Sequence, residues 1–166
     1  DFWQIGAMLT LVPWIVLLPR WWGRYQWPEE SVPWRGWMFF WWAFLVVSGV
    51  TAFFPGMLDR LKFTQGLVAH SHLAMAGFTS SFCATLLATL GVRVGNTRSI
   101  VFWNGAALGM VLSLSIMGWL EGADQGWMMA RPAWRTAGLG VRTLCGAVML
   151  VVAVKWWWQS MKEGEA

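Results

Sequence analysis

Charged side chains are scarce in this sequence. They make up 12% of its 166 residues, whereas apolar residues reach 57%, and a soluble domain usually carries about 25% charged residues. This balance, with a mean hydropathy of +0.50, excludes an ordinary soluble domain and predicts an integral membrane protein. A net charge of +4 would suggest a nucleic-acid partner for a soluble chain. Here the basic residues fall mostly between apolar runs, where they set topology, so we expect the lipid bilayer as partner and no nucleic acid.

Cysteine is nearly absent. Cys83 and Cys145 both lie in apolar runs, and no CxxC spacing occurs. The sequence therefore indicates neither a disulfide framework nor a cysteine-ligated metal, and we expect both residues to be small buried side chains. Long linkers, low-complexity tracts and internal repeats are also missing, so residues 1–166 form one membrane domain.

Apolar runs long enough to cross a bilayer occur five times, at about 20 residues per spanning helix. They cover residues 2–19, 36–58, 66–92, 99–120 and 136–158. A spanning helix satisfies its own backbone groups in lipid, so the fold class is all-α, an integral membrane bundle of about five helices. Pro13 predicts a kink in the first span. Gly105 and Gly109 form a small-xxx-small pattern that favours close helix packing.

Tryptophan is abundant, with sixteen residues, many near the ends of the apolar runs. Indole prefers the headgroup zone, where its ring is half buried and its N–H meets water. We therefore expect interfacial belts formed by Trp21, Trp22, Trp34, Trp37, Trp119, Trp127, Trp134, Trp156, Trp157 and Trp158.

Basic residues divide unequally between the two predicted ends of the bundle. One end holds Arg20, Arg24, Arg35, Arg93, Arg98, Lys155 and Lys162. The other holds Arg60, Lys62, Arg131 and Arg135. The positive-inside rule places the first end in the cytoplasm. The C-terminus is then cytoplasmic, and the span 66–92 runs from the outer face inward.

The only two histidines, His70 and His72, stand one residue apart near the outer end of that span. On a helix they point about 200° apart, whereas two ligands of one metal ion would be three or four residues apart. Each histidine is therefore a candidate ligand for a separate centre, such as the iron of a haem held between bundle helices. The alternative is that neighbouring helices or the outer interface satisfy both imidazoles.

The stretch "VAHSHLAMAGF" resembles the His-x-His helix, the tenth of twelve, in the catalytic subunit of the haem–copper oxidase superfamily. Residues 117–135, "MGWLEGADQGWMMARPAWR", are similar to the pattern "AGIMQGLMWR" that ends the next helix in the cbb-type oxidases. Residues 140–153, "GVRTLCGAVMLVVA", are similar to "VIRLLGGLLYLSGM", with which their last helix begins. The resemblance implies that the five spans correspond to helices eight to twelve, and its topology agrees with the charge count.

The resemblance also implies roles for individual residues. His70 would bind the high-spin haem beside copper, and His72 the low-spin haem. Arg131 and Arg135 would hold haem propionates, which a bidentate guanidinium suits; the alternative is that they are ordinary interfacial arginines. Arg142 lies within the last span and needs a carboxylate, propionate or carbonyl partner.

The family's catalytic subunit uses six histidines, and this chain has two. The resemblance therefore implies a split, truncated or fragmentary catalytic subunit that is not active alone. It would share two haems with a partner chain, which carries the missing helices and the copper ligands. The implied activity is dioxygen reduction with electrons from a c-type cytochrome, coupled to proton uptake, in a bacterial-type inner (cytoplasmic) membrane. A nitric oxide reductase-like subunit and a non-catalytic scaffold or anchor subunit are the alternatives.

Two polar groups remain. The hydroxyls of Thr79, Ser80, Ser81, Thr85 and Thr89 follow the histidine span toward the cytoplasm. They are either the lining of a proton path or, as is more usual, donors to carbonyls of their own helix. Glu121 and Asp124, at the outer end of the fourth span, are expected to be solvated loop acids. Proton exit or a calcium site is the alternative for this pair.

Overall fold

The computed structural model describes residues 2–124, 126 and 132–163, and every regular element in these ranges is a helix. The elements in chain order are α1 (Phe2–Leu9), α2 (Trp14–Trp22), the 3₁₀ turn η1 (Glu29–Ser31), α3 (Val32–Ala52), α4 (Met57–Leu61), α5 (Gln65–His72), the π-helical η2 (Leu73–Thr79), α6 (Ser80–Thr89), α7 (Thr97–Ala123) and α9 (Ala133–Glu163). The predicted all-α class is therefore confirmed.

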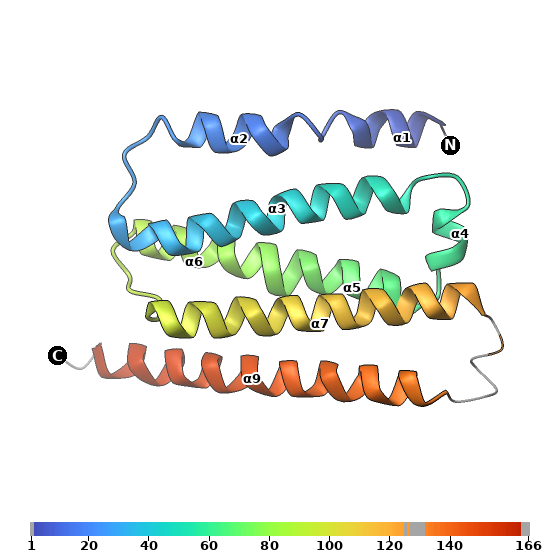
Figure 1. Cartoon of the computed structure of the whole chain (residues 1–166). Coiled ribbons are helices and arrows are strands. Elements are labelled where there is room, and N and C mark those ends of the chain that lie inside the picture. Colours follow the sequence, from blue (N-terminus) through green and yellow to red (C-terminus); the bar gives the residue numbers. More distant parts are fainter. Residues whose placement is uncertain (1, 125, 127–131, 164–166) are drawn as a thin grey trace.

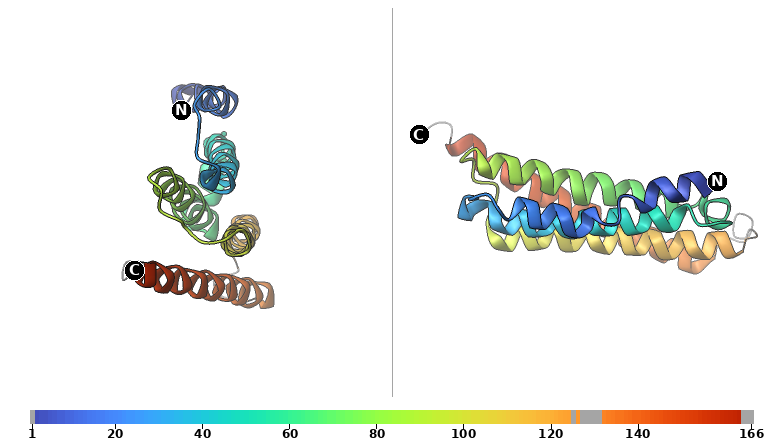
Figure 2. Two further views of the ribbon diagram at one scale, coloured as in Figure 1. Left: turned by 90° about the vertical axis from the view of Figure 1, so that its left-hand side faces the viewer. Right: turned by 90° about the horizontal axis from the view of Figure 1, so that it is seen from above.

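Successive long helical segments run antiparallel, so that α3 and α7 point one way and α1–α2, α5–α6 and α9 the other (Figure 1). Seen end-on, α1–α2 and α9 lie at opposite edges, with α3, α5–α6 and α7 between them (Figure 2, left). One end of the bundle, here the α4 end, holds the start of α1, α4, the start of α5 and the end of α7. The opposite end, here the C-terminal end, holds the end of α2, the start of α7 and the end of α9.

Three helical segments are long and apolar enough to cross a membrane: 2–22, 97–123 and 133–162. They overlap the first, fourth and fifth predicted spans. Helical structure also occupies the second and third, as α3 and as the continuous run of α5, η2 and α6. The α3 helix is rich in tryptophan, and each element of the run is short. That α3 and the α5–α6 run cross the membrane as well stays a prediction.

The predicted kink in the first span is confirmed. α1 ends at Leu9 and α2 begins at Trp14, with a turn between them. Pro13 stands at the junction, where its missing N–H and its ring disfavour an unbroken helix. The two short helices pack mainly on α3 and have no buried residue among those described, so this part of the chain adds little to the core.

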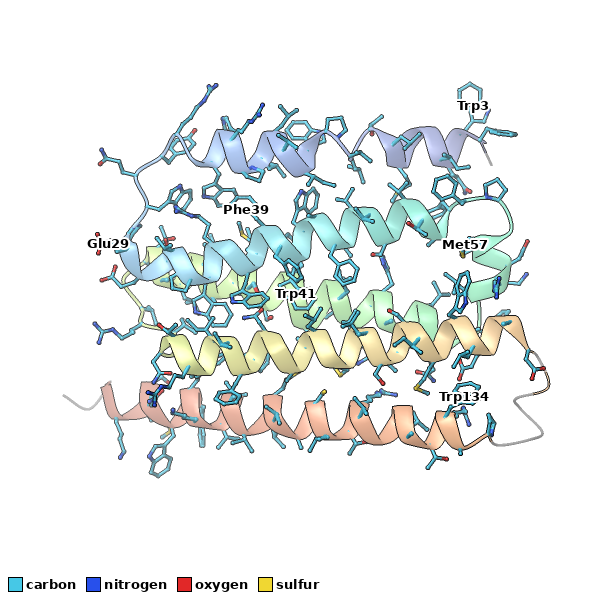
Figure 3. All side chains as sticks on the ribbon, viewed as in Figure 1. Trp3, Glu29, Phe39, Trp41, Met57 and Trp134 are labelled. Atoms are coloured by element: carbon cyan, nitrogen blue, oxygen red, sulfur yellow. The ribbon has the colours of Figure 1, made fainter. Side chains whose placement is uncertain are left out.

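A polar cluster at the centre of the bundle joins α3, α6 and α7. The indole of Trp41, fully buried, donates from Nε1 to Asn104 Oδ1 at 2.7 Å. Ser81 Oγ lies 3.4 Å from the same oxygen, and Asn104 Nδ2 donates to the Ile100 carbonyl at 2.9 Å. The buried amide is thereby satisfied, as a polar group in an apolar core must be. Figure 3 shows Trp41 at the middle of the bundle.

The prediction of an interfacial belt is wrong for Trp34. Its side chain is buried, and its Nε1 donates to the Val94 carbonyl at 2.9 Å. Trp156 packs beside it and donates to Ser99 Oγ at 2.9 Å. Trp34 thus bonds the connection between α6 and α7, and the partly buried Trp156 bonds the first turn of α7, so each indole N–H has an acceptor inside the protein. Trp21, Trp119, Trp157 and Trp158 are exposed, and Trp127 lies outside the described residues.

The closest packing along α7 occurs at Gly118 and Gly122, and not at the predicted pair Gly105 and Gly109. A Cβ at Gly105 would meet open space, whereas one at Gly109 would lie 3.1 Å from Cys145 Sγ of α9. Gly118 and Gly122 instead face backbone: Gly118 lies against Gln65 and Gly66 of α5, and Gly122 against the carbonyl of Arg60. The histidine helix therefore approaches α7 at Gly118 more closely than any side chain there would allow.

The expectation that both cysteines are buried is also wrong. Cys83 is exposed on α6, and Cys145 is only partly buried where it faces Gly109. An exposed thiol on an apolar helix is compatible with a lipid-facing surface, because a thiol behaves as a small hydrophobe. The two free thiols lie on different helices.

Candidate functional site

The histidine helix α5 is capped by two side chains at its N-terminus. Thr64 is the N-cap residue, and its Oγ1 accepts a hydrogen bond from the Gly66 amide at 3.1 Å. The carboxylate of Glu121, from α7, accepts one from the Gln65 amide at 2.7 Å. The first amides of a helix lack partners within the helix, and negative charge is favourable there. These contacts define where α5 begins and so where His70 and His72 lie.

His70 is held from α3. Its Nδ1 lies 3.0 Å from the hydroxyl oxygen of Ser48, and that hydroxyl is 3.1 Å from the Leu45 carbonyl. Both contacts are satisfied when the Ser48 hydroxyl donates to the Leu45 carbonyl, which only accepts, and the Ser48 oxygen accepts from His70 Nδ1–H. This assignment follows from the hydrogen-bond network. In the neutral ring, His70 Nε2 then carries a lone pair and no proton.

His72 is held by its own helix. Its Nδ1 lies 2.8 Å from the carbonyl oxygen of Val68, one turn earlier. Because the carbonyl cannot donate, His72 Nδ1 carries a proton, and in the neutral ring Nε2 then carries the lone pair. A neutral imidazole that donates from Nδ1 and presents its Nε2 lone pair is the form in which a histidine ligates a metal.

The π-helical η2 begins directly after His72. Its wide turn is held by Thr79 Oγ1, which donates to the Ala74 carbonyl at 2.9 Å, and by Trp103 Nε1, which donates to the Ala76 carbonyl at 3.2 Å. The Trp41 ring packs directly against Gly77, and a Cβ added at Gly77 would lie only 2.6 Å from a ring carbon. Single π turns occur frequently at functional sites. Here one stands between the histidines and the hydroxyl-rich α6.

A cavity of about 290 Å³ opens beside His70, between α3, α5 and α7. Its walls are mostly apolar and include Phe44, Val47, Leu73, Val111 and Trp119, with His70 and Ser48 among its few polar residues. An apolar space with a convergent polar group is the usual form of a ligand site. The geometry brings one histidine, not both, to this cavity, in agreement with two separate centres.

Arg60 is a candidate site residue that sequence reasoning missed. Its guanidinium carbon lies 4.0 Å above the ring centroid of Trp119, a wall of the cavity. Its Nε is buried and finds no acceptor among the described residues. A buried guanidinium N–H calls for an anionic or carbonyl oxygen. In the sequence, Arg60 is a cation only five residues before the histidine helix, and the charge count used it only to assign topology.

The predicted propionate residues have different surroundings. Arg135 Nε lies 3.4 Å from Glu121 Oε1 in an ion pair. Arg142 is partly exposed on α9, with no acceptor within hydrogen-bond distance among the described side chains. Arg131 falls outside the described residues. The roles of all three toward a haem stay predictions.

The expectation that Glu121 is a solvated loop acid is wrong. Its side chain is 1% exposed and accepts from both Gln65 and Arg135. The tertiary approach of α5 and α9 to the end of α7 buries it. Asp124 is exposed and accepts from the Gly126 amide at 2.8 Å, as a loop acid does.

The hydroxyl series of the third span mostly donates to carbonyls of its own helix. Thr79, Ser80, Thr85 and Thr89 each bond a carbonyl four or five residues earlier, and Ser81 turns instead to Asn104. The usual role of such residues is therefore confirmed. A proton path through them draws no support from these contacts.

The basic residues divide between the ends of the bundle as the sequence predicted. The seven of the larger set lie at the C-terminal end, whereas Arg60, Lys62 and Arg135 lie at the α4 end together with the start of the histidine helix (Figure 1). Which end faces the cytoplasm stays a prediction. Compared with known proteins, the chain matches no family model, no curated protein and no solved structure.

Proposed function

We propose that this chain is a membrane subunit of a haem–copper oxidase-like respiratory complex, in which His70 and His72 are axial ligands of two haems. One observation carries the proposal: each imidazole makes its hydrogen bond through Nδ1, and no described residue bonds either Nε2. Ligating histidines characteristically donate their second ring nitrogen to a carbonyl or another oxygen, which sets the tautomer and the ring orientation. Histidines buried only for packing have no such requirement to leave Nε2 without a partner.

The residues around the histidines fit a large planar group. Ala69, Ser71 and Ala74 have small side chains, which leave space on the helix surface beside both rings. The cavity at His70 is lined mostly by apolar side chains. A bound haem would supply one-electron transfer and, at an open iron position, dioxygen chemistry. The chain itself would bind through the two Nε2 atoms, hold the rings through Ser48 and Val68, and exclude water with Phe44 and Val111.

The remaining parts of the site must come from partners. The copper ligands and the second low-spin ligand would belong to another membrane subunit, and electrons would come from a c-type cytochrome. In this proposal the α4 end faces the outside of a bacterial-type inner membrane, which puts His70 and His72 near the outer face. The larger basic charge of the C-terminal end supports this orientation.

Separate substitutions of the histidines test the proposal. In the complex purified from its native membrane, His70→Ala is expected to remove the high-spin haem signal and His72→Ala the low-spin signal. Each loss follows from removing one Nε2 ligand. Reduced-minus-oxidised spectra and a pyridine haemochrome assay measure both. Ser71→Ala, between the two histidines, is the matched control, because its hydroxyl only bonds the Leu67 carbonyl.

The spectra separate the alternatives. Unchanged spectra in both variants would overturn the ligand proposal and favour a scaffold subunit. The nitric oxide reductase-like alternative would be favoured if the parent complex shows the haem signals and consumes nitric oxide but not dioxygen.

Ser48→Ala tests the support behind the ligand. Removing the acceptor of His70 Nδ1–H is expected to lower haem affinity at His70 by roughly 10- to 100-fold, the usual cost of losing such a partner. The measurement is the rate at which high-spin haem transfers to excess apomyoglobin, with the low-spin haem at His72 as internal reference. Equal transfer rates in Ser48→Ala and the parent complex would contradict the assigned hydrogen bond.

A further inference from the structure

A second cavity lies in a groove between α7 and α9, beside the start of α7 and the later turns of α9. These parts of the two helices lie toward the C-terminal end of the bundle (Figure 1). The volume of the cavity is about 540 Å³, larger than that of the cavity beside His70. None of the residues that line it belongs to the histidine site. Its occupant is therefore a separate question from the proposed function.

The walls of this groove are apolar along most of its length. Val148, Val151 and Val152 repeat on one face of α9, at the spacing of three and four residues that aligns side chains along a helix. Phe102 of α7 lines the groove opposite these valines. Phe102 is 64% exposed and Val151 is 68% exposed. Such a strip suits a linear hydrocarbon chain.

The end of the groove carries two cations. Arg98, in the first turn of α7, and Lys155, one turn beyond Val151 on α9, both line it. Neither is within ion-pair distance of a carboxylate among the described side chains. The neighbouring polar residues are already engaged, since Asn96 caps α7 through the Ser99 amide and Ser99 Oγ accepts from Trp156. The two cations thus remain for a ligand.

The corner that holds these cations is preformed. Trp156 is fixed by its bond to Ser99 and packs against both Trp34 and Trp103, with ring centroids 5.4 and 5.3 Å away. The α7 start and the α9 end are therefore held together before any ligand arrives. Preorganisation of this kind lowers the entropic cost of binding.

We infer that this groove binds one anionic phospholipid, with an acyl chain along the valines and Phe102 and the phosphate between Arg98 and Lys155. Charge complementarity selects this occupant: basic pockets between spanning helices at a positively charged end bind acidic headgroups. A partner helix would fill the apolar groove without using the cations. A free phosphate would use the cations without the groove.

The inference is tested by measuring which lipids the complex retains. Native mass spectrometry of the complex, reconstituted with equal amounts of phosphatidylglycerol and phosphatidylcholine, is expected to show preferential retention of phosphatidylglycerol. The double variant Arg98→Gln and Lys155→Gln should lose that preference by about tenfold or more, since each cation near the surface contributes of the order of a fivefold preference. The matched control is Arg20→Gln with Arg24→Gln, two exposed cations at the same end of the bundle.

A second variant tests the apolar part. Ala147→Leu adds side-chain volume to the groove and should lower phosphatidylglycerol retention, whereas soluble glycerophosphoglycerol should not compete with the lipid. Three results would overturn the inference: an unchanged lipid ratio in the double variant, an equal loss in the matched control, or full competition by the soluble headgroup. A parent complex that retains phosphatidylglycerol and phosphatidylcholine equally would also overturn it. Haem spectra are expected to be unaffected throughout, so this inference and the proposed function fail separately.

Discussion

Replacing Gly118 with alanine is expected to destabilise the bundle and displace the histidine helix. The added Cβ would lie 2.9 Å from the carbonyl carbon of Gln65 and closer still to the backbone of Gly66. Backbone cannot rotate out of the way as a side chain does, so α5 must shift away from α7. Overpacking of this kind costs about 1–3 kcal/mol. The loss is measured by unfolding in mixed detergent followed by tryptophan fluorescence, and by the haem signals of the complex.

Gly105→Ala is the matched control on the same helix. An added Cβ there meets nothing within 4 Å, and alanine is favoured over glycine in a helix by up to about 1 kcal/mol. We expect this variant to be as stable as the parent or slightly more so. If Gly118→Ala were as stable as Gly105→Ala, the close contact between α5 and α7 would be contradicted.

Removing the carboxylate of Glu121 is expected to give the other large effect. Glu121→Ala takes the acceptor from the Gln65 amide at the start of the histidine helix and removes the ion pair between Glu121 and Arg135. Breaking a fully buried pair costs about 3–5 kcal/mol. The Arg135 side chain is 32% exposed, so water partly replaces the lost partner and we expect about 2–3 kcal/mol. The free energy of unfolding and hydrogen exchange of the Gln65 amide measure the effect.

Glu121→Gln separates the two contributions. Its amide oxygen still accepts from Gln65, while the ion pair with Arg135 is lost. We expect this variant to lose about 1 kcal/mol, in the range of a single hydrogen bond to a neutral group, and to keep the Gln65 amide protected. Equal exchange rates in Glu121→Ala and the parent would show that the carboxylate does not hold the start of α5.

Much of the architecture is predictable from local pattern. Apolar runs of the length of a bilayer predict helices at the right places, and Pro13 predicts the break between α1 and α2. The spacing of His70 and His72 alone indicates that they serve different partners. The division of basic residues between the two ends follows once the helices alternate in direction, because each short connection reverses the chain.

The surroundings of the site residues escape such prediction. Glu121 and Asp124 are acids three residues apart at the end of one helix, yet one is buried and the other exposed. Trp34 has the sequence context of an interfacial tryptophan and is instead a core residue bonded to Val94. In each case the deciding contact comes from a segment elsewhere in the chain, which periodicity within one helix does not reveal.

By itself, the sequence determined that this protein is helical and apolar, where its helices lie, and that two imidazoles share one helix on different faces. His72 bonds a carbonyl of its own helix, one turn earlier, and only the tertiary structure decided how His70 is held. Ser48 meets His70 across 22 residues of chain, and Glu121 meets the start of α5 across 56. Local propensity acts over a few residues, whereas these hydrogen bonds exist because α3, α5 and α7 pack together and exclude water. Packing therefore set the hydrogen-bond partner of His70, the acceptor at the helix start and the cavity beside His70.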